Sequence, residues 1–109
     1  KLDATGCQFH QNGGDGVRVR GSTTTARLTN CTSHHNKDDG VLAYSDAVVD
    51  LMGEQTSVHD NEGHGLSARW DGTINVYQPC VLNDMSHGNK DQNIREGAGG
   101  IVQQKDSKK

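Results

Sequence analysis

A motif that recurs four times along the chain constrains the fold more than any other feature of this sequence. Each copy consists of a histidine, one variable residue and an asparagine. The asparagines are Asn12, Asn36, Asn61 and Asn89, and the intervals between them are 24, 25 and 28 residues. A near-constant period of this length is the signature of a repeat architecture in which each copy forms one structural unit. The chain is therefore expected to stack four copies of one unit.

A second recurring position of the repeat lies four residues after each asparagine. Gly16, Gly40 and Gly65 occupy it in the first three copies, and Asn93 occupies it in the fourth. Glycine adopts a positive φ without steric cost, and asparagine tolerates one. We therefore predict a turn with a left-handed backbone at this position.

The cysteines mark a third position, five residues before the asparagine. Cys7 and Cys31 occupy it in the first two copies, with Thr56 in the third, whereas Cys80 stands nine residues before its asparagine. Four extra residues near 82–85 account for that shift. We predict that Cys7 and Cys31 stack inside the fold as small apolar side chains. The three cysteines predict no disulfide framework.

Apolar and polar residues alternate in short runs within each repeat. Examples are Val17-Arg18-Val19 at 17–19, and the runs VDL at 49–51 and INV at 74–76. A two-residue period is typical of β-strands, and no segment keeps a helical apolar stripe for three turns. A period near 24 residues accommodates three short strands and three turns. The sequence thus predicts an all-β fold, a right-handed parallel β-helix of about four coils.

The composition agrees with such a narrow solenoid. Leu, Ile, Val and Phe together number only 19 of 109 residues, while glycine contributes 14 and the formal net charge is −3. A coil buries only its inward side chains, and backbone hydrogen bonds between coils about 4.8 Å apart supply much of the cohesion. We expect the four asparagines to stack as a ladder of side-chain amides.

The pattern C-x-x-H-x-N-x-x-x-G-V, at 7–17 and again at 31–41, resembles the parallel β-helix repeat proteins of the pectin-lyase-like superfamily. The likeness covers residues 2–94, and the segment 87–101 looks similar to uncharacterised β-helix proteins of algae. We expect a repeat domain over 1–104 and a polar tail over 105–109. The chain starts at Lys1, without a methionine, which suggests a part of a longer polypeptide.

The residue before the turn glycine carries the candidate chemistry. Asp15, Asp39 and His64 occupy this position, with Asp38 beside Asp39. The surrounding segments, NGGDG at 12–16, DDGV at 38–41 and GHGLS at 63–67, look like the catalytic motifs of polygalacturonases. That resemblance implies inverting hydrolysis, with one aspartate as general acid, the others activating water, and the histidine in support. Inverting hydrolysis requires two carboxyl groups about 6.5–9.5 Å apart.

A structural role for the same residues is the competing interpretation. Aspartate and glycine are favoured in turns, and every coil is built alike. The Arg-x-Lys element of polygalacturonases is not reproduced, since only Arg95 of the segment 94–96 is basic. Four coils also span only about 20 Å at strand spacing. We therefore expect a non-catalytic interaction or scaffold module, with a polysaccharide-active enzyme as the alternative.

The four histidines of the motif form a further predicted column. His10, His34, His59 and His87 each follow an inward position, so we expect them to point outward from one face. Stacked imidazoles repel one another when protonated. A linear column provides no tetrahedral cage, and we predict no metal site and no cofactor.

Other sequence features narrow the partners. The chain has no basic cluster, which argues against nucleic-acid binding, and no apolar stretch long enough for a membrane span. Exposed strand edges at the two ends call for a cap from neighbouring coils or a protein partner. Tyr44 and Trp70 are expected to flank one another outside the solenoid, where they suit a protein or a polysaccharide. Nothing indicates the cellular compartment.

Overall fold

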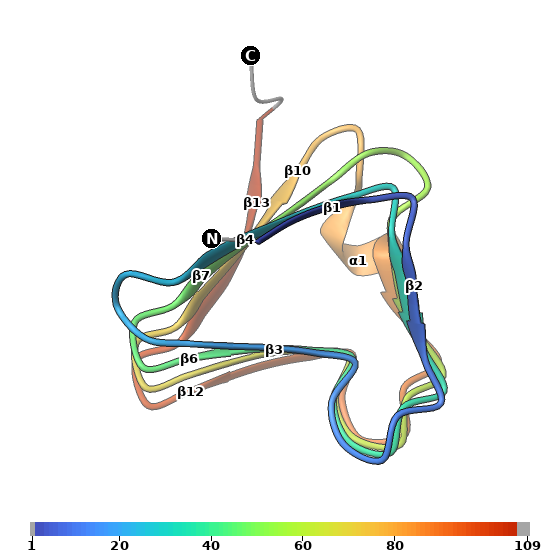
Figure 1. The fold of residues 1–109 in the computed structure, drawn as a ribbon, viewed down its shortest axis with the longest axis horizontal. Helices are drawn as coiled ribbons and strands as arrows, with labels where there is room; N and C mark the ends of the chain where they lie inside the picture. The colour runs from blue at the N-terminus through green and yellow to red at the C-terminus, as the bar shows by residue number, and fades with distance from the viewer. Residues whose placement is uncertain (1, 107–109) are drawn as a thin grey trace.

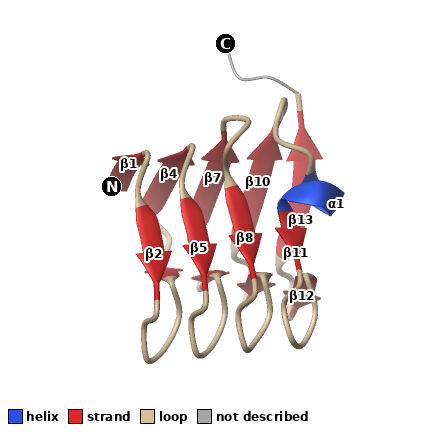
Figure 2. Cartoon of the chain, turned by 90° about the vertical axis from the view of Figure 1, so that its right-hand side faces the viewer, coloured by secondary structure: helices blue, strands red, loops and turns tan. Residues whose placement is uncertain are grey.

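The structure, a computed structural model, describes residues 2–106. Within them the chain winds into four coils that share one outline when viewed along the axis, apart from the connections between sheets at the top right (Figure 1), and stand side by side when viewed from the flank (Figure 2). Each coil contributes one strand to each of three sheets, a further strand at the C-terminal end makes one of the sheets five-stranded, and every strand pairing is parallel. The predicted all-β parallel β-helix of about four coils is confirmed.

The three sheets follow one another around each coil. Sheet A has the spatial order β1 (Leu2–Thr5), β4 (Thr25–Thr29), β7 (Val48–Met52), β10 (Thr73–Tyr77) and β13 (Ile101–Lys105). Sheet B contains β2 (Gln8–His10), β5 (Thr32–His34), β8 (Ser57–His59) and β11 (Ser86–His87). Sheet C contains β3 (Val17–Arg20), β6 (Val41–Tyr44), β9 (Leu66–Arg69) and β12 (Ile94–Gly97). A connection that bulges outward joins sheet B to sheet C in every coil (Figure 1).

The core is a set of columns, because the register places equivalent inward residues on top of one another. In sheet A, Ala26 pairs with Val49, which pairs with Ile74. These three side chains are buried. Medium-sized aliphatic side chains fill the narrow interior without large aromatic residues, which explains the low apolar content of the sequence.

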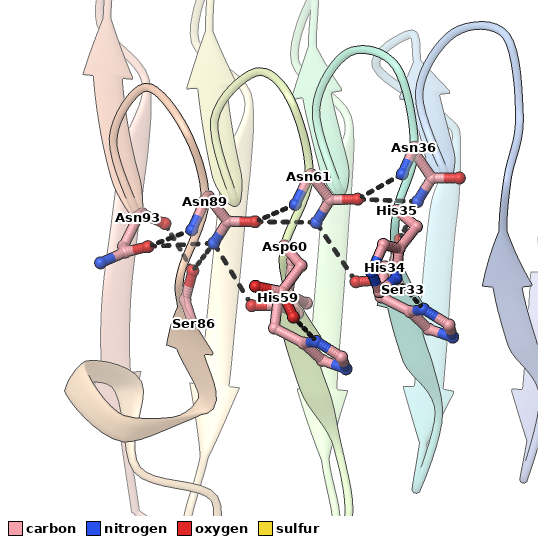
Figure 3. A network of polar contacts seen from close by, with 11 residues as sticks. Ser33, His34, His35, Asn36, His59, Asp60, Asn61, Ser86, Asn89 and Asn93 are labelled. Carbon is pink, nitrogen blue, oxygen red and sulfur yellow. Dashed lines mark hydrogen bonds and ion pairs between the residues drawn. The ribbon is translucent and has the colours of Figure 1, made fainter.

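The asparagine ladder forms along the connections between sheets B and C. The Nδ2 of Asn12 donates to the Oδ1 of Asn36 at 2.9 Å, and Asn36 donates to Asn61 in the same way at 2.9 Å. Asn61 continues the series to Asn89 at 2.8 Å. The backbone N–H of each donating asparagine bonds the same oxygen, so the Oδ1 atoms of Asn36, Asn61 and Asn89 each accept two bonds from the preceding coil (Figure 3). The ladder thereby satisfies buried backbone groups at a turn.

The reason predicted for the turn glycines was wrong. Gly16, Gly40 and Gly65 have no positive φ, which occurs instead at the variable residue of the His-x-Asn motif, for example at His35. The glycines are needed because the next coil lies too close. A Cβ added to Gly40 would stand 2.3 Å from the Cγ1 of Val58 and 3.0 Å from the carbonyl oxygen of Gly65.

The four extra residues of the last repeat form the one-turn helix α1 (Leu82–Met85), which buries Met85. It lies beside the start of β11 (Figure 2). Cys7 and Cys31 stand at the same level of neighbouring coils, each directly before the paired residues Gln8 and Thr32, but the expected burial of Cys7 is wrong because its thiol is exposed. Cys31 and Cys80 are buried, and all three thiols are free.

Two further expectations concern the ends of the chain and membranes. Lys105, which we assigned to a polar tail, ends strand β13, while residues 107–109 of that tail lie outside the described residues. No helix within residues 2–106 has the length and apolar character needed to cross a membrane.

Candidate functional site

A cleft of about 480 Å³ lies where the bulging connections meet the outer face of sheet C. Its acidic and imidazole side chains come from the connections: Asp15, Asp38, Asp39, His64 and Asp91. Its basic side chains come from sheet C: Arg18, Arg69 and Arg95. Its apolar surface is supplied by Leu42, Tyr44 and Trp70. The cleft thus combines both signs of charge with an aromatic pair.

Strand alternation explains why sheet C contributes these residues. The strand begins directly after the turn glycine, so residues two and four positions after the glycine point outward. Arg18 and Leu42 are paired at the first outward position, and Tyr44 and Arg69 at the second. The residue before the glycine ends the connection and faces the same side.

Two of the candidate carboxylates bind the backbone of the next coil. The Oδ1 of Asp15 accepts from the backbone N–H of Asp39 at 2.9 Å, and the Oδ1 of Asp39 accepts from the backbone N–H of His64 at 2.7 Å. The Oδ2 of Asp39 lies 3.8 Å from the Nη2 of Arg69. Asp39 is 6% exposed. Its carboxylate therefore forms part of the coil-to-coil framework, as the structural interpretation expected, and little of it faces the cleft.

The environment of Asp15 favours its protonated form. Burial raises the pKa of this carboxyl above its usual value, and the negative charges of Asp39 and Asp38 raise it further. The hydrogen bond from the Asp39 backbone and the positive charge of Arg18 oppose that rise. A raised pKa is the property expected of a carboxyl group that acts as a general acid.

An aromatic pair stands beside the carboxylates. The ring centroids of Tyr44 and Trp70 are 6.0 Å apart, with an interplanar angle of 61°. The Tyr44 hydroxyl accepts from the Nε and Nη2 of Arg18 at 3.0 and 2.8 Å, which fixes the tyrosine. The guanidinium groups of Arg18 and Arg20 lie 5.4 and 5.9 Å from the tyrosine ring centre. Trp70 is 57% exposed, so its indole is available to a ligand.

Three buried polar atoms in and around the cleft have no hydrogen-bond partner among the residues the structure describes. They are the Nδ1 of His64, the Oγ of Ser67 and the Nε of Arg69. Buried polar atoms in proteins are nearly always bonded, so each of these can bond a ligand or water. Ser67 is paired with Leu42, a lining residue of the cleft.

The histidine column lies on a different face, along sheet B. The rings of His10, His34, His59 and His87 stack with centroids 5.1, 5.0 and 5.3 Å apart. The Nδ1 of His34 lies 2.7 Å from that of His35, and the Nδ1 of His59 lies 2.8 Å from a carboxylate oxygen of Asp60 (Figure 3).

The surroundings of His34 favour its neutral form. Burial lowers the pKa of His34, and the imidazoles of His59, His35 and His10 lower it further. In residues 2–106, no group of three or more His, Cys, Asp or Glu side chains is placed to hold a metal ion.

The structure brings Asp15, Asp38, Asp39 and His64 into one cleft, and places Tyr44 beside Trp70. Sequence reasoning missed Arg18, Leu42, Arg69 and Asp91 as lining residues. The sequence could have indicated Arg18, Leu42 and Arg69, because each lies two or four positions after a turn glycine and so on the outer face of its strand.

One comparison with known proteins gives a match. A family model described as a right handed beta helix region matches residues 2–107. Neither the curated proteins nor the solved structures contain a match to the chain.

Proposed function

Because the chain belongs to the right-handed β-helix family, we propose that it is a non-catalytic binding module whose cleft on sheet C takes a saccharide. The observation that carries this proposal is the Tyr44–Trp70 pair, in which Trp70 is exposed and Tyr44 is half-buried, and which stands beside both arginines and carboxylates. Aromatic rings stack on the apolar faces of sugars, while charged groups hydrogen-bond the hydroxyls. The open shape of the cleft suits a segment of a longer chain.

The hydrogen bonds of the carboxylates support a role without catalysis. One carboxylate oxygen of Asp15 and one of Asp39 each accept a hydrogen bond from a backbone N–H of the following coil. This arrangement repeats with the coils, as a structural role requires. The groups that remain for a ligand are the aromatic pair and the arginines that line the cleft.

Isothermal titration with defined oligosaccharides, one neutral series and one oligogalacturonate series, tests the proposal. Replacing Trp70 with alanine is expected to weaken binding about five- to tenfold, because stacking of one aromatic ring contributes about 1–1.5 kcal/mol. Val81→Ala is the matched control, since Val81 is 47% exposed and lies away from the cleft near α1. Equal affinities for the two variants would contradict the proposal.

A second candidate is a glycoside hydrolase, favoured by the raised pKa of Asp15 in the same cleft as Asp38 and His64. New reducing ends from polygalacturonate would reveal this activity. Asp38→Asn is the informative variant, because Asp38 is exposed, whereas changing Asp39 also removes a structural hydrogen bond. Activity that is lost in Asp38→Asn would favour the hydrolase over the binding module.

A further inference from the structure

Two histidines that are adjacent in the second copy of the repeat bring two ring nitrogens together. His34 ends strand β5 and belongs to the histidine column, whereas His35 follows it with an exposed side chain. Their Nδ1 atoms lie 2.7 Å apart (Figure 3). The backbone of His35 is left-handed, with a φ of 55°, and the two rings meet at 86°. The linear column alone offers no cage, but His35 stands beside it and adds a second nitrogen.

The separation of these nitrogens fits two neighbouring ligands of one metal ion. A zinc ion binds imidazole nitrogen at about 2.0–2.1 Å, so two ligands at a right angle stand about 2.9 Å apart. The Nδ1 atoms of His34 and His35, at 2.7 Å, are close to that spacing. Because His35 is exposed, its ring can rotate and turn the lone pair toward an ion. The pair is thus near a chelating geometry.

Both Nδ1 lone pairs become available without the loss of a proton. In the hydrogen bond between the rings, one Nδ1 carries the hydrogen and the other accepts it. The donor ring frees its Nδ1 by moving that hydrogen to Nε2, the other tautomer of neutral imidazole. Burial lowers the pKa of His34, and the imidazoles of His59, His35 and His10 lower it further, while the charge of Asp60 opposes them. His34 is therefore neutral near neutral pH, as a metal ligand must be.

The other coils place different groups beside the column histidine. The Nδ1 of His10 lies 3.2 Å from the Oε1 of Gln11, and the Nδ1 of His59 lies 2.8 Å from a carboxylate oxygen of Asp60. In the fourth copy the following residue is Gly88, which has no side chain. Within residues 2–106, the second copy is therefore the one that places an imidazole nitrogen at this point.

A carboxylate from the next coil adds negative charge near the pair. The backbone N–H of His35 donates to the carbonyl oxygen of Asp60 at 3.1 Å, so the two residues are neighbours across the coils. The charge of Asp60 acts on both His34 and His35. No three side chains of the ligand types converge within residues 2–106, so water must fill the remaining positions of an ion held here.

We propose that His34 and His35 form a chelating site for a divalent transition-metal ion. Imidazole suits copper, nickel and zinc, whereas magnesium and calcium prefer oxygen ligands. Structural zinc sites have four protein ligands. An open pair of imidazoles suits an ion that exchanges with the surroundings. The site lies beside sheet B, so it is independent of saccharide binding on the outer face of sheet C.

Isothermal titration of the untagged chain with nickel chloride near neutral pH tests the proposal. Wild type should bind one ion per chain, and magnesium chloride should give no signal. His35→Gln should weaken nickel binding about tenfold or more, because one of the two imidazole ligands is lost. The variant preserves the fold, since Gln11 occupies the equivalent place in the first copy with the same φ of 55°. Below about pH 6 the wild-type affinity should fall, because protonated imidazole cannot bind a metal.

His87→Gln is the matched control. It removes a column imidazole that has no side-chain partner at the following Gly88, and it should leave the nickel affinity unchanged. In NMR spectra, paramagnetic nickel should first broaden the amide signals of His34 and His35. The proposal is overturned if wild type binds no nickel, if His35→Gln binds it as tightly as wild type, if His87→Gln weakens binding equally, or if broadening begins at the carboxylates around Asp38.

Discussion

The Oδ1 of Asp39 lies 2.7 Å from the backbone nitrogen of His64, one coil further along the solenoid. Both residues occupy the position before the turn glycine, and Asp15 makes the equivalent bond to the backbone of Asp39 at 2.9 Å. Asp15 and Asp39, which the sequence suggests as catalytic residues, therefore connect neighbouring coils through hydrogen bonds. This relationship separates what the carboxylates do for stability from what the cleft offers to a ligand.

Asp39→Ala should destabilise the fold by about 2 kcal/mol, because it leaves the partly buried backbone N–H of His64 without its acceptor. Urea unfolding followed by circular dichroism measures the loss. Asp38→Ala is the matched control, since its side chain is exposed, and it should change stability by less than about 0.5 kcal/mol. Equal losses for the two variants would refute a structural role of the Asp39 carboxylate.

Gly40→Ala should cost about 1–3 kcal/mol, because the new methyl group would overlap Val58 and the backbone of Gly65. Gly13→Ala provides the control, because no atom lies within 4 Å of a Cβ at that position and its φ is not positive. The control should be neutral or slightly stabilising. Thermal unfolding of both variants distinguishes close approach from backbone flexibility as the reason for the turn glycine.

Asn61→Ala should destabilise the fold more than Asn12→Ala. The Oδ1 of Asn61 accepts from both the backbone N–H and the Nδ2 of Asn36, and the residue is 1% exposed. Its removal leaves the backbone N–H of Asn36 without an acceptor and takes one of the bonds of the Asn36 Nδ2, which costs about 2–4 kcal/mol. Asn12 only donates, from the exposed end of the ladder. A loss at Asn12 as large as that at Asn61 would show that the ladder does not act through buried acceptors.

The histidine column should make stability fall in mild acid. The folded-state pKa of His34 is lowered from its ordinary value of 6.5, so the unfolded chain binds more protons in the interval below that value. The contribution of His34 is complete above pH about 6.5, and decreases as pH falls toward the folded-state pKa. Asp60 opposes part of this effect because its negative charge raises the pKa of His34.

Denaturant unfolding at a series of pH values between 8 and 5 measures this dependence. His34→Gln should flatten it, because the variant removes the central imidazole between His10 and His59. His87→Gln, at the end of the column, is expected to flatten it less. A wild-type profile that does not change across this range would contradict the account of the column.

The solenoid was predictable from the sequence because its period appears directly in the spacing of Asn12, Asn36, Asn61 and Asn89. The reason why position 40 is a glycine could not be predicted. A positive φ and a close approach of the next coil both favour glycine, and only the three-dimensional structure of Gly40 distinguishes the two. The exposed Cys7 escaped prediction for another reason. Equivalent positions in a repeat need not be equally buried, and the spacing does not reveal the difference between Cys7 and Cys31.

The candidate site was partly predictable. Asp15, Asp39 and His64 share one position of the repeat, so stacking brings them together in any β-helix. The hydrogen bonds that the carboxylates of Asp15 and Asp39 accept from the next coil depend on side-chain geometry, which the spacing of residues in the sequence does not reveal. Asn93 was visible as the exception in the glycine position, but the bonds that its Oδ1 accepts from Asn89 depend on where its side chain turns.

Fluorescence of the single tryptophan tests the central claim most directly, because Trp70 lies in the proposed saccharide cleft and no other indole contributes. Titration with an oligosaccharide that the module binds should shift or quench the emission of wild type and of Asp38→Asn in a saturable way, with no reducing ends released. Emission that stays unchanged while calorimetry detects binding, or reducing ends that accumulate only with the intact Asp38, would contradict a non-catalytic saccharide-binding cleft.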